Sequence, residues 1–302
     1  MQLLFIGYGS IAKRHISNIF ELFCDVEIDV LRSGKGVPAS SDNPDLRFIN
    51  SEDDLKASYD AVFITNPTVL HYDTLRRHHS LSNSFFIEKP VFETDEKPLD
   101  FLDSNKNYYV ACPLRYSDII EYIRKNIDFN MVYSVRCISS SYLPDWRPGT
   151  DYRTVYSAKK ESGGGVSIDL IHEWDYLCFL VGLPNKVKSI ITKKSELEID
   201  SDDVAVYIAE FDGLVAEIHL DYFGRQPMRV LELFTKDGTI RADLINQKIE
   251  WLGTDRCIEF SNERNNYQRK ELLHFFDICN GKCDNDSTIE GACRVLKIAR
   301  GE

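Results

Sequence analysis

The strongest candidate for acid–base chemistry is His172, which lies in a segment over 166–181 whose apolar residues recur at helical spacing. At about 100 degrees per residue, His172 shares one side of this predicted helix with Asp169 and Asp175. A histidine flanked by carboxylates can act as a general base, because its imidazole titrates near neutral pH. The same spacing fits a structural histidine that is hydrogen-bonded to Asp169 or Asp175, so the pattern alone leaves both interpretations open.

A second candidate, for phosphate binding, opens the chain. The apolar residues 3–6 predict a buried strand, and Gly7 and Gly9 follow it, just before a predicted helix. Gly7 permits a tight turn, and Gly9 has no Cβ, so a pyrophosphate could approach the backbone at the positive end of the helix dipole. With Ala12 at the third glycine place, this spacing predicts a dinucleotide site, and a plain strand-to-helix turn is the alternative. The residues expected at that site are Gly7, Gly9, Ser10 and Ile11.

The end of the next predicted strand, 26–31, bears on the choice of dinucleotide. An acidic residue there would accept hydrogen bonds from the adenosine ribose of NAD. This chain instead carries Arg32, Ser33 and Lys35, which suit the 2′-phosphate of NADP. Asp29 is the nearest acid, and strand alternation leaves its direction open. NADP is therefore favoured over NAD, with an ordinary basic turn in an NAD-binding protein as the alternative.

Polar residues also follow two further predicted strands, 59–65 and 85–87. The carboxyl ends of parallel strands form the ligand crevice of an open sheet. We therefore expect these residues to converge on the cofactor. They are Asn66, Pro67, His71, Glu88, Lys89 and Pro90.

A loop over 144–153, punctuated by Pro and Gly, precedes the helix of His172. Its two arginines, Arg147 and Arg153, could clamp a phosphate or carboxylate while Trp146 and Tyr152 cover a sugar ring. The alternative is a structural loop that is packed by Trp146 and leaves both arginines in solvent.

Composition excludes several classes of function. The chain has 36 basic and 48 acidic side chains, a net charge of −12, which argues against a nucleic-acid partner because such binding depends on basic surfaces. The first strand begins almost at Met1, leaving no room for a signal peptide, and no run of about 18 apolar residues predicts a membrane helix. We therefore expect no membrane partner and a cytoplasmic location. The eight cysteines are expected to be reduced thiols, and none stands at metal-ligand spacing with a histidine, so no metal is expected.

The predicted fold class is α/β with two domains. Strands alternate with helices over residues 1–114, including a short helix predicted over 51–58, which indicates a Rossmann domain with a parallel sheet. Residues 115–302 contain many strand-like runs, with hairpin signals at Asp212-Gly213 and Asp237-Gly238. They predict an α+β domain with an open, mostly antiparallel sheet and helices on one face.

Taken in order, these motifs resemble the Gfo/Idh/MocA family of oxidoreductases, which includes glucose–fructose oxidoreductase and inositol dehydrogenase. The matching stretches are the Gly-rich start, 60–67 with His71, Glu88-Lys89-Pro90, Pro113-Leu114-Arg115-Tyr116 and the triple glycine 163–165 before the helix. The resemblance implies NAD or NADP bound between a Rossmann domain and a substrate domain. It also implies that the open sheet of the second domain mediates a homodimer or homotetramer.

The resemblance assigns roles to individual residues. Lys89 takes the place of the family lysine beside the nicotinamide and the reacting carbon, and His172 takes the place of the usual proton acceptor. The family commonly has an aspartate four residues before that histidine; Ile168 stands there in this chain, and Asp169 comes three before. The role of Asp169 is therefore open. The residues expected to bind substrate are Lys89, Arg115, Arg147, Tyr152, Arg153, Asp169 and His172.

The resemblance implies an NAD(P)-dependent oxidoreductase that transfers a hydride between the cofactor and a secondary hydroxyl or ketone. The substrate class would be a sugar, a nucleotide-linked sugar or a cyclic polyol, with bacterial surface-sugar biosynthesis as a candidate setting. Two alternatives stay open. One is a non-catalytic NAD(P)-binding sensor or scaffold, and the other is a reductase of a non-sugar ring compound.

Overall fold

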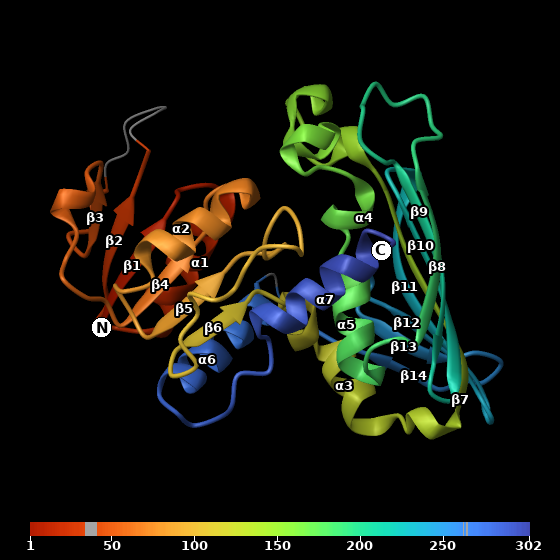
Figure 1. Cartoon of the computed structure of the whole chain (residues 1–302). Helices are drawn as coiled ribbons and strands as arrows, with labels where there is room; N and C mark the ends of the chain where they lie inside the picture. The colour runs from red at the N-terminus through yellow and green to blue at the C-terminus, as the bar shows by residue number, and fades with distance from the viewer. Residues whose placement is uncertain (34–40, 262, 264) are drawn as a thin grey trace. The chain divides into compact units, whose positions relative to one another are not determined.

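A computed structural model describes residues 1–33, 41–261, 263 and 265–302. The chain forms two compact units, of which the first comprises residues 1–113 with 265–294, and the second residues 114–264 with 295–302. Figure 1 shows each unit built on its own sheet. The segment 265–294, which the sequence analysis gave to the second domain, packs with the first unit. The predicted assignment of separate functions to 1–114 and 115–302 stays a prediction.

The first unit is a six-stranded parallel sheet with the strand order β3-β2-β1-β4-β5-β6. This order reverses direction between β1 and β4, which is where doubly wound sheets bind dinucleotides. The strands are β1 (Gln2–Ile6), β2 (Glu27–Leu31), β3 (Leu46–Ile49), β4 (Ala61–Ile64), β5 (Ser84–Ile87) and β6 (Asn107–Val110). The helices are α1 (Ser10–Leu22), α2 (His71–His78), α6 (Asn266–Cys279) and the first part of α7 (Ile289–Ala299).

The core of the first unit explains why these strands form. β4 and β5 are continuous apolar runs that are buried along their whole length, as expected for parallel strands covered on both faces. Phe63 on β4 stacks on Phe5 of β1 with ring centroids 4.4 Å apart, and Phe275 of α6 packs edge-on against Phe63 at 5.5 Å. The buried carboxylate of Glu271 accepts a hydrogen bond from the backbone N–H of Cys112. These contacts hold α6 on the sheet although it lies far from β4 in the sequence.

Two local elements differ from expectation. The helix predicted over 51–58 is a single 3-10 turn, η1 (Glu52–Asp54), which Ser51 caps by accepting a hydrogen bond from the Asp53 N–H at 3.2 Å. A segment of eight residues is too short to be a stable α-helix without packing, and no side chain of η1 is buried. The edge strand β3 was not predicted, because the charged Arg47 interrupts a run of only four residues.

The second unit is an eight-stranded sheet with the order β14-β13-β12-β11-β7-β10-β9-β8. Only the β7–β10 pair is parallel among the described pairs, so the predicted open, mostly antiparallel sheet is confirmed. Its strands are β7 (Val132–Tyr142), β8 (Lys186–Thr192), β9 (Val204–Phe211), β10 (Leu214–Asp221), β11 (Phe223–Thr235), β12 (Gly238–Asp243), β13 (Lys248–Trp251) and β14 (Cys257–Glu259).

The helices α3 (Asp118–Asn126), α4 (Val166–Asp169) and α5 (His172–Val181) lie on one side of this sheet, as Figure 1 shows. The continuous helix predicted over 166–181 is broken between α4 and α5, because Leu170 leaves the helical region with φ −97° and ψ 29°. Between β7 and α4 the chain forms a series of short 3-10 turns. They are η5 (Leu143–Asp145), η6 (Tyr152–Thr154), η7 (Tyr156–Ala158) and η8 (Lys160–Ser162).

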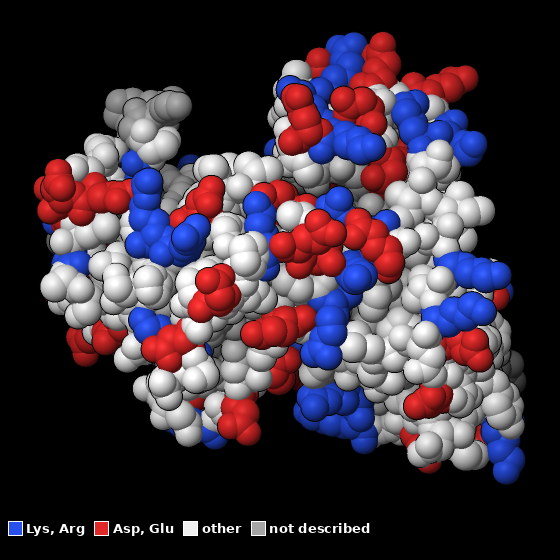
Figure 2. Space-filling model, viewed as in Figure 1, with Lys and Arg blue, Asp and Glu red and all other residues white. Residues whose placement is uncertain are grey.

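Acidic and basic side chains are interspersed over the face shown in Figure 2. Several form local ion pairs, such as Lys56 with Glu27 at 2.8 Å and Arg77 with Glu52 at 3.0 Å. The exclusion of a nucleic-acid partner rests on net charge and stays a prediction. Among the helices of the described residues, none has the length and apolar character needed to cross a membrane.

Candidate functional site

The glycine turn after β1 has the geometry that a dinucleotide requires. Gly7 has φ +104°, and a Cβ there would lie 2.7 to 2.9 Å from backbone atoms of Thr65 and Asn66, so only glycine fits. A Cβ on Gly9 would meet nothing within 4 Å, so the space above Gly9 is open to a ligand. Gly7 therefore serves the fold, and Gly9 keeps an approach to the backbone clear.

The N-terminus of α1 supplies a partial positive charge that complements a phosphate. Gly9 is the N-cap and offers no side-chain cap, and the first turn of this 13-residue helix contains no acidic residue. The positive end of the helix dipole, at Ser10 and Ile11, therefore has no compensating acid within its own first turn. Such an end can bind a phosphate through backbone N–H groups.

The carboxylate of Asp29 is hydrogen-bonded to two side chains of the first unit. Its two carboxylate oxygens accept hydrogen bonds from Nε and Nη2 of Arg47 at 2.8 and 2.7 Å, and the Tyr59 hydroxyl donates to it at 2.8 Å. Burial alone would raise the pKa of Asp29, but the hydrogen bonds from Arg47 and Tyr59 outweigh it, so the pKa lies below its usual value. The side chain of Asp29, the acid nearest the end of β2, therefore points to β3. The sequence alone did not decide this direction.

A group of aromatic and basic side chains lies beside the glycine turn. The Arg32 guanidinium lies 5.9 Å from the ring centroid of Phe48, which packs edge-on against Tyr8 at 4.8 Å. The Lys13 ammonium lies 5.0 Å from the centroid of the Tyr8 ring. Ser33 is exposed after β2, and Lys35 lies outside the described residues. Cationic groups therefore stand on both sides of this aromatic pair.

Asn66 and His71 form a fixed corner after β4. The ring nitrogens of His71 face two backbone carbonyls, that of Val91 at 3.1 Å and that of Asn66 at 2.9 Å. Burial lowers the pKa of His71, and because a neutral imidazole carries a single N–H, the neutral ring donates to only one of these two carbonyls at a time. The Asn66 amide donates to Thr74 at 2.8 Å, and its buried Oδ1 has no hydrogen-bond partner among the described residues. This unsatisfied acceptor and the open approach at Gly9 both fit a polar cofactor at this edge of the sheet.

Glu88 ends β5 and pairs with a histidine that the sequence analysis missed. His15 on α1 is buried, and its Nε2 lies 2.6 Å from a carboxylate oxygen of Glu88. Burial would raise the pKa of Glu88, but the hydrogen bond and charge of His15 outweigh it and lower the pKa. The pair therefore fixes α1 against the end of β5. Lys89 follows directly, half-buried, and the Lys89–Pro90 peptide bond is cis.

In the second unit, two ion pairs flank His172 in α5. Glu173 is fully buried and lies 2.7 Å from Nε of Arg229 on β11, so this pair fixes the inner face of α5 on the sheet. Asp175 accepts hydrogen bonds from Nε and Nη2 of Arg115 at 2.9 and 2.6 Å. Arg115, expected to bind substrate, thus also holds the helix, and His172 is half-buried at the start of α5.

Asp169 lies at the end of α4 and is almost fully buried, at 5% exposure. It accepts a hydrogen bond from the Tyr222 hydroxyl at 2.5 Å and one from Tyr156. Burial, together with the negative charge of Asp169, raises the pKa of both tyrosines, so their hydroxyls stay protonated. The structure therefore makes Asp169 the centre of a tyrosine network, a role that sequence spacing to His172 did not reveal.

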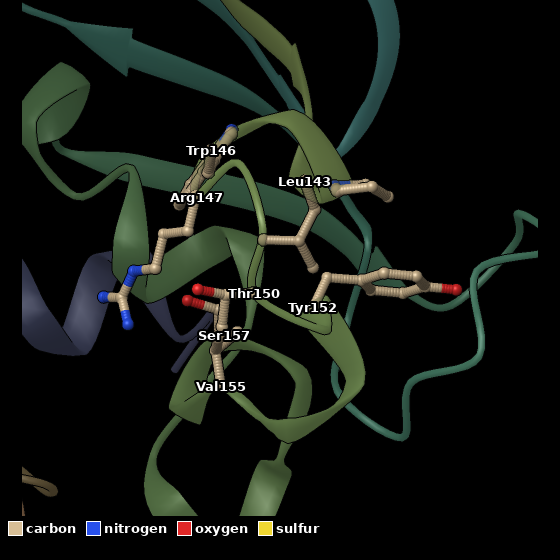
Figure 3. Close-up of a pocket in the computed structure, with 8 residues that line it drawn as sticks. Leu143, Trp146, Arg147, Thr150, Tyr152, Val155 and Ser157 are labelled. Atoms are coloured by element: carbon tan, nitrogen blue, oxygen red, sulfur yellow. The ribbon is translucent and has the colours of Figure 1, made fainter.

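The loop over 144–153 lines a small cavity, shown in Figure 3. The Tyr152 ring lines this cavity, while its hydroxyl accepts a hydrogen bond from the Glu198 N–H at 3.2 Å. Arg153 forms ion pairs with Asp151 and Glu198, both at 2.9 Å. Arg147 lines the cavity and lies over the Tyr156 ring at 5.9 Å. The two arginines that the sequence treated alike are therefore in different electrostatic surroundings.

Comparison with known proteins finds a family whose C-terminal domain is similar to part of this chain. A sequence model described as the GFO/IDH/MocA C-terminal domain matches residues 122–241, which run from α3 into β12. Residues 122–241, less than half of the chain, are therefore similar to the C-terminal domain of this family. The resemblance carried by the motifs is thus confirmed, as is the fold class of a parallel Rossmann sheet with a mostly antiparallel second sheet.

The chain is also similar to several characterised proteins. It is 24% identical over 204 residues to D-xylose dehydrogenase from Paenarthrobacter nicotinovorans, and the match covers 60% of this chain and only 52% of that enzyme. UDP-N-acetylglucosamine 3-dehydrogenase from Acidithiobacillus ferrooxidans superposes with a TM-score of 0.77 at 19% identity, covering 99% of this chain and 95% of that one. The WlbA dehydrogenase from Bordetella pertussis, solved with NADH and UDP-GlcNAcA, gives 0.77 at 17% identity, covering 100% and 94%. At these identities the solved structures share the fold.

Proposed function

We propose that this protein is an NAD(P)-dependent oxidoreductase that transfers a hydride between a nicotinamide cofactor and a secondary hydroxyl or ketone of a sugar-like substrate. The observation that carries the proposal is the open backbone at Gly9, at the N-terminus of α1 and at the switch point of the six-stranded sheet. The similar D-xylose dehydrogenase and the other dehydrogenases support the reaction class. A second support is the unsatisfied Oδ1 of Asn66 at the same edge of the sheet.

In the proposed mechanism, residues of this chain accept the substrate proton and stabilise the negative charge that develops on the substrate oxygen. His172 accepts the proton of the substrate hydroxyl as the C–H bond breaks, and Lys89 donates a hydrogen bond to the same oxygen while negative charge develops on it. The nicotinamide, when bound, takes the hydride with both electrons of the C–H bond. In the reverse direction His172 returns the proton to the carbonyl oxygen. The ion pairs of Glu173 and Asp175 support this role because they fix the helix that presents the imidazole.

The test is turnover in Lys89→Ala and His172→Ala. Positioned proton transfer contributes about 100- to 10,000-fold, so each variant should lose at least about 100-fold in kcat with its fold intact. Lys125→Ala and His79→Ala, which change a lysine and a histidine placed outside the proposed site, are matched controls and should retain wild-type rates. Folded Lys89→Ala and His172→Ala proteins with near-normal rates would refute the assignment.

We propose that NADP is preferred over NAD. The carboxylate of Asp29, the acid nearest the end of β2 among the described residues, already accepts hydrogen bonds from Arg47 and Tyr59. Arg32 and Ser33 directly follow β2, and side chains of these types can donate hydrogen bonds to a 2′-phosphate. Arg32→Ala should weaken NADP binding more than NAD binding in a calorimetric titration, and equal losses would contradict this preference.

We further propose that nucleotide-linked sugars are among the substrates and that the enzyme serves surface-sugar biosynthesis in the cytoplasm. The support is the similarity to UDP-N-acetylglucosamine 3-dehydrogenase and to a dehydrogenase solved with UDP-GlcNAcA. Assays with UDP-N-acetylglucosamine, D-xylose and myo-inositol separate this class from neutral sugars and polyols. Turnover of the neutral compounds alone would contradict the nucleotide-sugar assignment.

We propose that the outer face of the second sheet forms a homo-oligomer interface. Ile190 on β8, Ile208 on β9 and Val215 on β10 point to that face and are 68%, 62% and 48% exposed. Exposed apolar residues grouped on neighbouring strands mark an association surface. Light scattering should find a dimer or tetramer for the wild type and a monomer for Ile208→Asp, and a monomeric wild type would contradict the proposal.

A further inference from the structure

The sequence predicted three arginines at the substrate site, and in the structure these arginines differ in whether a carboxylate pairs with them. Arg115 is neutralised by Asp175, and Arg153 by Asp151 and Glu198. Arg147 is exposed, and among the described residues its recorded side-chain contact is with the ring of Tyr156 rather than with a carboxylate. A guanidinium that is stacked on a ring and lacks an acid keeps its donors available for an anion.

The ring beneath Arg147 is held in place. The Tyr156 hydroxyl bonds to the buried Asp169, while 45% of the residue stays exposed. Asp169 also accepts the hydrogen bond of Tyr222, so its position is fixed from a second element. Tyr156 therefore presents a fixed ring to Arg147, and the Asp169 that holds it ends α4, which only the break at Leu170 separates from the helix of His172.

Trp146, the neighbour of Arg147 in the loop, is fixed by the same network. The Trp146 ring packs edge-on against Tyr222 with centroids 5.2 Å apart, and its Nε1 donates to the Ser141 hydroxyl at 2.9 Å. Thr150 and Ser157 bring hydroxyl groups to the cavity that Arg147 lines (Figure 3). The enclosed space of this cavity, about 10 Å³, is far smaller than the roughly 300–1,000 Å³ of typical ligand pockets, so a substrate group would contact Arg147 on the exposed surface of the loop and not inside the cavity.

We infer that Arg147 binds an anionic group of the substrate, a phosphate or a carboxylate, and that Asp169 is a positioning residue that acts through Tyr156. This inference rests on the proposed oxidoreductase function and narrows its substrate to anionic sugars. The planar guanidinium can donate two parallel hydrogen bonds to either group. Asp169 contributes by fixing the platform, and it transfers no proton to the substrate.

The experiment compares Arg147→Gln with the wild type on three compounds: UDP-N-acetylglucosamine, the carboxylate sugar D-glucuronic acid and neutral myo-inositol. Arg147→Gln should raise KM at least about 10-fold for the anion that the enzyme uses, with kcat and the KM for a neutral substrate unchanged. The anion affected distinguishes a phosphate from a carboxylate. Arg256→Gln, which removes an exposed arginine stacked on Trp251 elsewhere in the unit, is the matched control and should leave every KM unchanged.

Tyr156→Phe and Asp169→Asn test the platform. Both should raise the same KM for the anionic substrate by about three- to tenfold and leave kcat within about twofold, a split that loss of folding would not produce. An unchanged KM in Arg147→Gln, or a wild type that turns over only myo-inositol, overturns the inference while the oxidoreductase function stands. If the wild type reduces or oxidises none of the three compounds, calorimetric binding of UDP-N-acetylglucosamine and D-glucuronic acid to Arg147→Gln decides the inference separately. Equal binding to wild type and variant, or to neither, then overturns it.

Discussion

Substituting each glycine of the first turn by alanine should separate folding from cofactor binding. In Gly7→Ala the new Cβ would lie 2.7 to 2.9 Å from backbone atoms of Thr65 and Asn66, at a residue with φ +104°. The unfavourable φ costs about 1–2 kcal/mol and the overpacking about 1–3 kcal/mol, while the reduced entropy of the unfolded chain returns about 0.4–1 kcal/mol. Gly7→Ala should therefore lower the free energy of unfolding by about 1–5 kcal/mol.

In Gly9→Ala the new Cβ meets no protein atom within 4 Å, so the folded chain is not strained. Alanine is a poorer N-cap than glycine, but it also lowers the entropy of the unfolded chain, and these effects nearly cancel at about 0.5 kcal/mol each. The same Cβ would occupy the space that the pyrophosphate needs. Gly9→Ala should keep its stability and lose at least about tenfold in cofactor affinity, which is about 1.4 kcal/mol.

Urea unfolding measures the free energy of unfolding, and calorimetric titration with NADP and NAD measures the affinity for the cofactor. The two variants should give opposite outcomes, a stability loss in Gly7→Ala and an affinity loss in Gly9→Ala with unchanged unfolding. Wild-type cofactor affinity in Gly9→Ala would refute the placement of the pyrophosphate at this turn. Wild-type stability in Gly7→Ala would refute the close approach of β1 and β4.

Two further predictions concern buried carboxylates of the first unit. His15 lowers the pKa of Glu88 below its usual 4.5, so the pair stabilises the fold fully above that pH and loses this contribution as pH falls through the folded value. Glu88→Gln should cost about 1–3 kcal/mol at pH 7 in urea unfolding, and the difference from wild type should shrink below about pH 4.5; a difference that grows in acid would contradict the sign. Asp29→Asn should destabilise the protein by about 1 kcal/mol, since Arg47 is half exposed, and should leave the ratio of NADP to NAD affinity unchanged. A tenfold loss of NAD affinity in Asp29→Asn would show that this carboxylate binds the ribose.

Local patterns predicted much of the fold, because they reflect local constraints. β1, the glycine turn and α1 follow from an apolar run, two glycines and a helical repeat in adjacent residues. β3 escaped prediction because an edge strand of four residues with a charged centre has no strong period. The break after α4 was not predicted. The apolar stripe of the sequence continues through Leu170, but the backbone of Leu170 leaves the helical conformation.

The sequence suggested candidate site residues, but it did not reveal the side chains that pair with them in the structure. The partners that matter are distant in sequence: Glu88 and His15 are 73 residues apart, and Asp169 and Tyr222 are 53 apart. Spacing on one helix suggested that Asp169 serves His172, but its partner Tyr222 lies between β10 and β11. Such pairings depend on the tertiary fold, so no local pattern could have identified them.

The most direct test of the account follows the hydride itself. UDP-N-acetylglucosamine carrying deuterium at its third carbon, with a parallel set of deuterated D-xylose and myo-inositol, is incubated with NADP or NAD, and the nicotinamide is analysed by mass spectrometry. The account predicts deuterium on the reduced nicotinamide with the wild type and its loss by at least about 100-fold with Lys89→Ala and His172→Ala. A reduced cofactor without deuterium, or equal transfer in the folded variants, would contradict it.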